Sequence, residues 1–214
     1  KSALITFITA GDPSFNFSKQ VLLNLPKAGA DLIEIGVPFS DPMADGPIIQ
    51  KSYRRALKNG VNLDEVLSLV KMFRKKNNYT PIVLMGYYNP FFQKGIKSFL
   101  KEAEKVGVDG VLIVDLPPEN DDEIRKHLSD YKLKVIRLAS PTTDRQRLNK
   151  ILKISSGFLY YVSITGITGS GLSKFNTLKN AYNKLKRYSN IPIVVGFGIN
   201  TPEKAKIVSK YADG

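Results

Sequence analysis

The sequence contains no cysteine, and this absence removes several classes of chemistry at once. Without a thiol, the chain cannot form disulfides, thiolate zinc sites, iron–sulfur clusters or a cysteine nucleophile. Only one histidine is present, His127, and it lies in a polar, helix-like stretch from Glu119 to Tyr131. Zinc hydrolases and serine triads need a positioned imidazole. We therefore interpret His127 as a solvated helix residue.

Long hydrophobic runs are also missing. The apolar runs, such as Ala3 to Thr9 and Ile191 to Phe197, are only as long as strands, so the sequence predicts no signal peptide and no membrane span. We expect a cytoplasmic protein. Hydrophobic residues nevertheless make up 43% of the 214 residues and charged residues 24%, which provides enough apolar surface for one mid-sized core.

Acidic residues are scarce relative to basic ones, 19 against 32, and the formal net charge is +13. A surface this basic can attract nucleic acids or anionic membranes. The lysines, however, are scattered along helix-like segments among acids, and they do not form an arginine-rich stripe with stacking aromatics. The pattern favours a solvated, lysine-rich surface, with no nucleic-acid and no membrane partner.

Strand-like and helix-like segments alternate along the whole chain. Short apolar runs predict strands at 3–9, 31–36, 81–87, 108–115, 133–138, 157–162 and 191–196. Amphipathic stretches between them predict helices at 18–27, 64–76, 95–106, 119–131, 144–153, 178–188 and 202–211. About seven βα units of this length indicate an α/β fold with a parallel sheet, and a (β/α)8 TIM barrel more than an open, doubly wound sheet.

A short pattern recurs where helices give way to strands. Ala28–Asp31 and Val106–Asp109 each end a helix at glycine and begin a strand after aspartate, and Tyr211–Gly214 repeats the pattern at the end of the chain. We therefore expect residues 1–214 to be one TIM-barrel domain that lacks its last βα unit. Such a barrel has two unpaired edges, so we expect low stability and a tendency to aggregate.

Glu34 is the first candidate for chemistry. In the segment 31–36, alternation places Ile33 and Ile35 on the face that packs against helices, and Glu34 on the face that lines the barrel. Desolvation there should raise the pKa of Glu34 toward neutrality, as a proton-transferring acid/base requires. Alternatively, the carboxylate only bonds backbone groups or water.

Other acids follow predicted strands. The proline-rich loop Pro38–Pro47 carries Asp41 and Asp45, which could be ordinary turn and cap residues, although Asp45 could also act with Glu34 as a second carboxylate. Asp115 alternates with Val111 and Ile113 and is predicted to point inward. It could support Glu34 or simply cap a loop.

Aromatic residues and glycine turns complete the predicted rim. Phe7, Tyr87 and Tyr160 lie at or near strand ends, where they could enclose a flat apolar substrate or belong to the core. The turns Gly166–Gly171 and Gly196–Gly198 let backbone N–H groups approach a phosphate, although glycine turns also occur for steric reasons alone.

The segment Glu34–Pro47, EIGVPFSDPMADGP, closely resembles the tryptophan synthase alpha subunit family. Further stretches carry the same resemblance across the chain, namely FITAGDP at 7–13, MGYYNP at 85–90, VDLP at 114–117, YYVSITGITG at 160–169 and GFGI at 196–199. The resemblance implies a lyase of L-tryptophan biosynthesis. Its reaction is retro-aldol cleavage of indole-3-glycerol phosphate to indole and glyceraldehyde 3-phosphate, with no metal or cofactor in this subunit.

The resemblance also implies roles for individual residues. Glu34 matches the catalytic acid/base, and Asp45 matches the carboxylate that binds the indole N–H. The positions around the indole are matched by Phe7, Tyr87, Asp115 and Tyr160. Gly169 and Gly198 match phosphate-binding backbone positions, and Thr168 lies on the loop that closes the site. A glycine–serine pair after an eighth strand would complete the phosphate site.

The family's partner is a beta subunit that carries pyridoxal phosphate, in an alpha2beta2 heterotetramer in which indole passes directly between subunits. The resemblance implies that Pro38–Asp45 and the regions around Asn89 and Pro117 face this partner. Two alternatives remain open at this point. One is another phosphate-binding barrel such as a sugar-phosphate epimerase, whose usual metal site needs histidines that this chain lacks. The other is a catalytically idle module that activates a partner.

Overall fold

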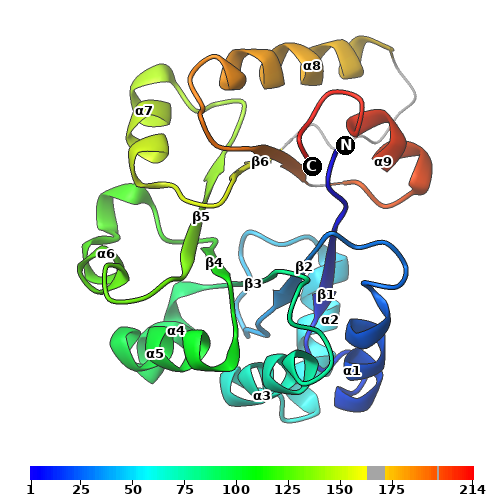
Figure 1. Cartoon of the computed structure of the whole chain (residues 1–214), viewed down its shortest axis with the longest axis vertical. Coiled ribbons are helices and arrows are strands. Elements are labelled where there is room, and N and C mark those ends of the chain that lie inside the picture. Colours follow the sequence, from blue (N-terminus) through cyan, green and yellow to red (C-terminus); the bar gives the residue numbers. More distant parts are fainter. Residues whose placement is uncertain (163–171, 197) are drawn as a thin grey trace. The chain divides into compact units, whose positions relative to one another are not determined.

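The computed structural model describes residues 1–162, 172–196 and 198–214. Parallel strands alternate with helices along the chain (Figure 1), as the sequence predicted. The chain divides into two compact units. One is Leu4–Lys134, and the other consists of Lys1–Ala3 and Val135–Gly214. Among the residues described, no helix is both long and apolar enough to cross a membrane.

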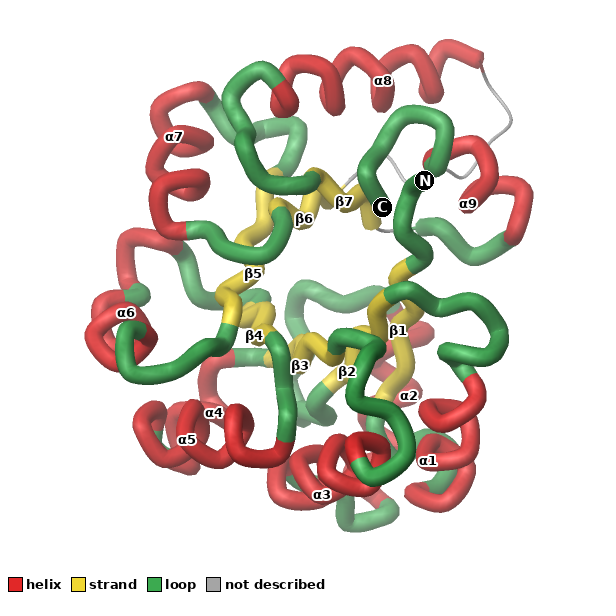
Figure 2. Tube along the Cα trace, in the orientation of Figure 1, coloured by secondary structure: helices red, strands yellow, loops and turns green. Residues whose placement is uncertain are grey.

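The unit Leu4–Lys134 contains four parallel strands that pair in the order of the sequence: β1 (Ile5–Thr9), β2 (Leu32–Gly36), β3 (Ile82–Gly86) and β4 (Gly110–Ile113). Its helical segments are α1 (Phe15–Asn24), α2 (Pro47–Lys58), α3 (Leu63–Arg74), α4 (Tyr88–Lys94), α5 (Ile96–Val106), the 3-10 turn η1 (Pro118–Asn120) and α6 (Asp122–Leu128). Figure 2 shows α1, α3 and α5 along one face of this sheet. His127 lies in the last turn of α6, as expected for a helix residue.

The second unit contains the parallel strands β5 (Lys134–Ala139), β6 (Leu159–Val162) and β7 (Ile193–Gly196). Its helices are α7 (Arg145–Ile154), α8 (Leu172–Lys186) and α9 (Pro202–Val208). Buried residues of β6 and β7 pack with residues of these helices around Leu148, Leu185 and Val208.

Alternation along β2 separates the two faces of the strand as predicted. Ile33 and Ile35 are fully buried, and the same is true of Leu69 and Val70 on α3. Burying each such side chain stabilises the fold by about 1.5–3 kcal/mol, which fixes the register of the strand. Glu34 therefore points to the opposite face.

Two helices were not predicted, α2 and α4. α2 begins with Pro47 at its first position and Gly46 as its N-cap, and the chain before it is rich in proline and glycine. This composition resembles a loop, although proline is well tolerated in the first turn of a helix. α4 spans only Tyr88–Lys94, too short for a periodic pattern.

The recurring aspartates have a common structural role. In each case one carboxylate oxygen accepts a hydrogen bond from the backbone N–H at the start of the preceding strand, at 2.8 Å from Leu4 to Asp31, 2.7 Å from Ile82 to Asp109 and 2.8 Å from Ile193 to Asp213. Each aspartate thus connects its own segment to the neighbouring strand. The sequence echo therefore marks a repeated junction between βα units.

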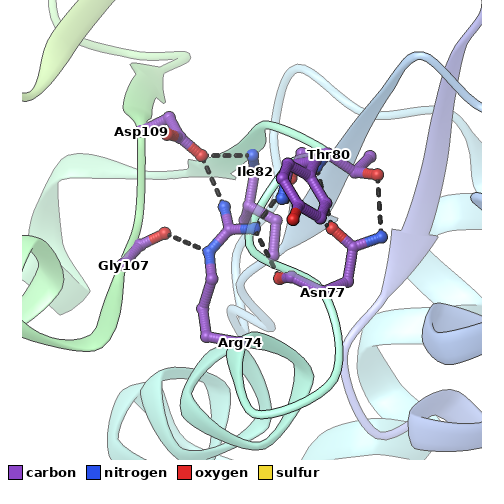
Figure 3. A network of polar contacts seen from close by, with 7 residues as sticks. Arg74, Asn77, Thr80, Ile82, Gly107 and Asp109 are labelled. Atoms are coloured by element: carbon purple, nitrogen blue, oxygen red, sulfur yellow. Dashed lines mark hydrogen bonds and ion pairs between the residues drawn. The ribbon is translucent and has the colours of Figure 1, made fainter.

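At Asp109 this junction includes an arginine (Figure 3). Arg74, at the end of α3, donates to Asp109 at 2.6 Å, to the Gly107 carbonyl at 2.8 Å and to the Thr80 carbonyl at 2.8 Å. It also donates to the Asn77 carbonyl at 3.1 Å. One guanidinium therefore ties the end of α3 to the beginnings of β3 and β4.

We expect Arg74→Met to lower the free energy of unfolding by about 2 kcal/mol, because hydrogen bonds to a charged group are lost while the apolar stem is kept. The loss should be moderate because Asp109, with 52% of its side chain exposed, can be solvated when its partner is removed. Urea unfolding measures the change, and Arg54→Met, at an exposed position of α2, is the control. Equal midpoints for the two variants would contradict this role of Arg74.

Candidate active site

Glu34 is a buried carboxyl group in the middle of β2. Only 3% of the residue is exposed, and its Oε1 atom has no hydrogen-bond partner among the described residues. Burial raises the pKa of Glu34 from 4.5 to about 7, because a charged carboxylate loses its hydration there. This agrees with the pKa shift predicted from the sequence. A carboxyl group of this pKa can both give and accept a proton near neutral pH.

Asp45 is held by Tyr87, which directly follows β3. The Tyr87 hydroxyl donates to Asp45 Oδ2 at 2.7 Å and accepts from the Ala44 N–H at 3.0 Å. The Phe39 ring stacks on the Tyr87 ring with a centroid distance of 5.3 Å. Burial raises the pKa of Asp45, and the hydrogen bond from Tyr87 opposes this by favouring the ionised form. Asp45 is therefore fixed by a tertiary contact, and the helix cap is Gly46 instead.

Phe7 and Gly36 lie beside Glu34. Phe7 is the register partner of Glu34 in the β1–β2 pair, so the two side chains share one face of the sheet. A methyl group on the Gly36 Cα would lie only 2.6 Å from Phe7 Cζ. Gly36 thus leaves room for the Phe7 ring next to the catalytic candidate, as expected for a wall of an aromatic pocket.

The two other acids that the sequence suggested as site candidates, Asp41 and Asp115, do not share the buried environment of Glu34. Asp41 is exposed, and its carboxylate accepts a hydrogen bond from the neighbouring Ser40 hydroxyl. Asp115 is also exposed, and it accepts a hydrogen bond from the Tyr88 N–H, at the first residue of α4, at 2.7 Å. Of the two roles considered for Asp115, this geometry fits the loop cap. β4 ends at Ile113, so strand alternation does not fix the orientation of Asp115, and its inward orientation stays a prediction.

Two further site candidates belong to the unit containing β5–β7. The Tyr160 hydroxyl lies over Gly196, where a methyl group on the Cα would be 2.0 Å from it. Gly198, just after β7, has a φ of +73°, a conformation that favours glycine. Thr168 and Gly169 lie outside the described residues. Within the described part of the chain, no group of three or more histidine, aspartate or glutamate side chains could hold a metal ion.

Sequence reasoning missed one polar group of the site, Tyr53. It reaches the Gly36 position from α2, and only 1% of the residue is exposed. Burial raises the pKa of its hydroxyl, and the charges of Asp45, Tyr87 and Glu34 raise it further. The signal that could have identified Tyr53 is the buried face of α2, formed by Ser52, Tyr53 and Ala56, but α2 itself was not predicted.

The fold and this site define an α/β enzyme of the parallel, strand–helix alternating class. Its candidate acid/base is a buried carboxyl group on a strand, and a second carboxyl group lies on the loop that follows. The sequence profile of the tryptophan synthase alpha chain family matches residues 1–214, and the chain belongs to this family.

Solved structures of the family agree with this assignment. Tryptophan synthase subunit alpha from Legionella pneumophila is 44% identical, with a TM-score of 0.93, over 100% of this chain and 79% of that one. The subunit from Campylobacter jejuni is 32% identical, with a TM-score of 0.90, over 100% and 85%. A match in the tryptophan synthase a2b2 complex from Pyrococcus furiosus is 40% identical, with a TM-score of 0.88, over 99% and 85%. These similarities confirm the predicted TIM-barrel fold class.

Proposed function

We propose that this chain catalyses the alpha reaction of tryptophan synthase, the retro-aldol cleavage of indole-3-glycerol phosphate to indole and glyceraldehyde 3-phosphate. The observation that carries the proposal is Glu34, a buried carboxyl group with a pKa of about 7 whose Oε1 atom has no partner among the described residues. It lies in a chain whose residues 1–214 match this lyase family. A carboxyl group that titrates near neutrality suits a reaction that needs an acid and a base in turn.

Cleavage of the carbon–carbon bond requires two proton transfers. Protonated Glu34 gives its proton to the indole ring carbon that bears the glycerol chain, and the ring becomes a cation. The carboxylate of Asp45 accepts a hydrogen bond from the indole N–H and stabilises that cation. Ionised Glu34 then takes the proton of the adjacent side-chain hydroxyl. The bond between ring and chain breaks, its electron pair returns to the ring, and an aldehyde forms with Glu34 protonated again.

The neighbouring residues supply the pocket for this chemistry. Phe7 borders Glu34 and offers aromatic surface to a flat indole. Tyr87 is fully buried and contributes by holding the Asp45 carboxyl group. Tyr160 is a further candidate for an indole contact. Asp115 contributes to the pocket indirectly, because it caps α4 by accepting a hydrogen bond from the Tyr88 N–H. For the phosphate, backbone N–H groups at Gly169 and Gly198 are the candidates, with Thr168 on the loop that excludes water.

The proposal extends to partners and location. The chain works in the cytoplasm without a cofactor of its own, and its partner is the pyridoxal-phosphate-dependent beta subunit. An apolar product such as indole would leak through membranes if released, so direct transfer to that subunit is chemically sensible. The candidate contact surface is the loop Pro38–Asp45 together with the regions around Asn89 and Pro117. Met43 in this loop is 81% exposed.

The test is indole release from indole-3-glycerol phosphate by the purified chain, alone and with a tryptophan synthase beta subunit. We expect indole in both cases and a higher rate in the complex. A chain that raises beta-subunit activity while releasing no indole would instead be an idle activating module, and the proposed reaction would be wrong.

A further inference from the structure

The Tyr53 phenol is a buried polar group that the mechanism above does not use. Among the described residues its hydroxyl makes no hydrogen bond, although the residue is only 1% exposed. Tyr87, the other buried phenol beside the carboxyl groups, makes two. Among the described residues, the Tyr53 hydroxyl oxygen is not one of the fully buried side-chain atoms that lack a partner, so it borders open space and is available as a donor.

The geometry places this donor near an unused acceptor. A methyl group on the Gly36 Cα would lie 3.1 Å from the Tyr53 hydroxyl oxygen, so the phenol borders that backbone position. Gly36 and Glu34 are two residues apart on one strand and face the same side, about 6.6 Å from each other along it. The Glu34 carboxyl group covers part of this distance, and the charge of Glu34 acts on the Tyr53 hydroxyl. The Tyr53 hydroxyl and the Oε1 atom of Glu34, neither of which has a hydrogen-bond partner among the described residues, thus lie on the same face of β2 near Gly36.

The protonation states suit a hydrogen bond between them. Burial and the nearby charges of Asp45, Tyr87 and Glu34 raise the pKa of Tyr53 far above neutrality, so the phenol keeps its proton as a donor. The Tyr87 hydroxyl already donates its hydrogen bond to Asp45, and the charge of Asp115 also raises the pKa of Tyr87. Of these two described phenols, Tyr53 is the one whose hydroxyl is available to Glu34.

We propose that Tyr53 is a positioning residue for Glu34, whose ionised carboxylate accepts a hydrogen bond from the Tyr53 hydroxyl. This bond holds the carboxylate in the orientation that accepts the substrate's hydroxyl proton, a step that rests on the proposed function. The bond also favours the ionised form, so its removal should raise the pKa of Glu34.

Replacing Tyr53 with phenylalanine removes the hydroxyl and keeps the ring. We expect Tyr53→Phe to raise the pKa of Glu34 by about half a unit to one unit. We expect kcat to fall by about tenfold with little change in KM, since the bond assists the proton transfer more than substrate binding. A tyrosine that only fills space would leave both quantities unchanged.

The primary experiment is a carbon-13 NMR titration of the glutamate carboxyl groups in the full chain without substrate. The Glu34 signal is identified by its absence in Glu34→Gln. Tyr161→Phe, which loses a buried hydroxyl in the core beside α7 and α8, is the matched control. A higher Glu34 pKa in Tyr53→Phe, but not in the control, supports the proposal. An unchanged Glu34 titration overturns it.

A second variant tests the sign of the effect. Difluorotyrosine at position 53 keeps the hydroxyl and makes it a stronger donor, so the pKa of Glu34 should fall relative to the parent. Failure of the proposed function would appear separately, as no indole release by the parent chain, and the titration would still report on the contact between Tyr53 and Glu34.

Discussion

Glu34→Gln should lower kcat for indole release by about 10²–10⁴-fold, the range expected when a general acid/base is removed. Glutamine has almost the same shape as glutamate, but it can neither give a proton to the indole ring nor accept one from the side-chain hydroxyl. Because the mechanism assigns both proton transfers to this carboxyl group, the substitution should impair both of them. KM should change little, since the amide still fills the space beside Phe7.

The pH dependence of the parent's activity provides a second test of the role of Glu34. With a pKa of about 7, Glu34 changes its protonation state within the range of an ordinary assay, so activity should depend on pH around neutrality. Glu203→Gln, an exposed position on α9, is the matched control and should keep the parental rate. Cleavage by Glu34→Gln at the parental rate would remove Glu34 from the mechanism.

The position of Glu34 was predictable because strand alternation is a local property. Ile33 and Ile35 must face the helices, and this leaves one orientation for the residue between them. Desolvation of a carboxyl group in such a place then follows from elementary electrostatics. The direction of the pKa shift was therefore predictable from the strand pattern, whereas the value of about 7 follows from the burial that the structure shows.

Tyr53 and the role of Asp115 could not be predicted in the same way. Both depend on where a segment lies relative to another one distant in the sequence, α2 against β2 in one case and the end of β4 against α4 in the other. α2 also begins in a stretch whose proline and glycine content resembles a loop. The contact of Tyr87 with Asp45 spans 42 residues, and no local pattern encodes it.

The repeated aspartates lie between these cases. The sequence showed the echo of Asp31, Asp109 and Asp213, but not its purpose, because the partner of each carboxylate is a backbone N–H some 20 to 27 residues away. A carboxylate can satisfy a strand's first N–H without reference to the side chain there. The need for this hydrogen bond therefore restricts the residue type at the aspartate position but not at the position of the N–H donor.

Between pH 4 and pH 8, the difference in stability between Glu34→Gln and the parent should change by about 3 kcal/mol in favour of Glu34→Gln. The pKa of this group is about 7 in the folded chain and 4.5 in the unfolded chain, a difference of 2.5 units at about 1.36 kcal/mol each. The folded state binds the proton more tightly. The stability from this group is therefore fully present below pH 4.5, declines as pH rises toward 7, and is lost above that value.

Urea unfolding of the parent and of Glu34→Gln at several pH values between 4 and 8 measures this effect. Below pH 4.5 the difference between the two proteins should be constant, because Glu34 is then protonated in both the folded and the unfolded chain. Above that pH the difference should change in favour of Glu34→Gln until it levels off above 7. Asp130→Asn, at an exposed position, controls for the loss of one negative charge from a chain of net charge +13. A constant difference at every pH would mean that Glu34 is hydrated when ionised. The same burial that suits Glu34 to proton transfer would then no longer account for its pKa.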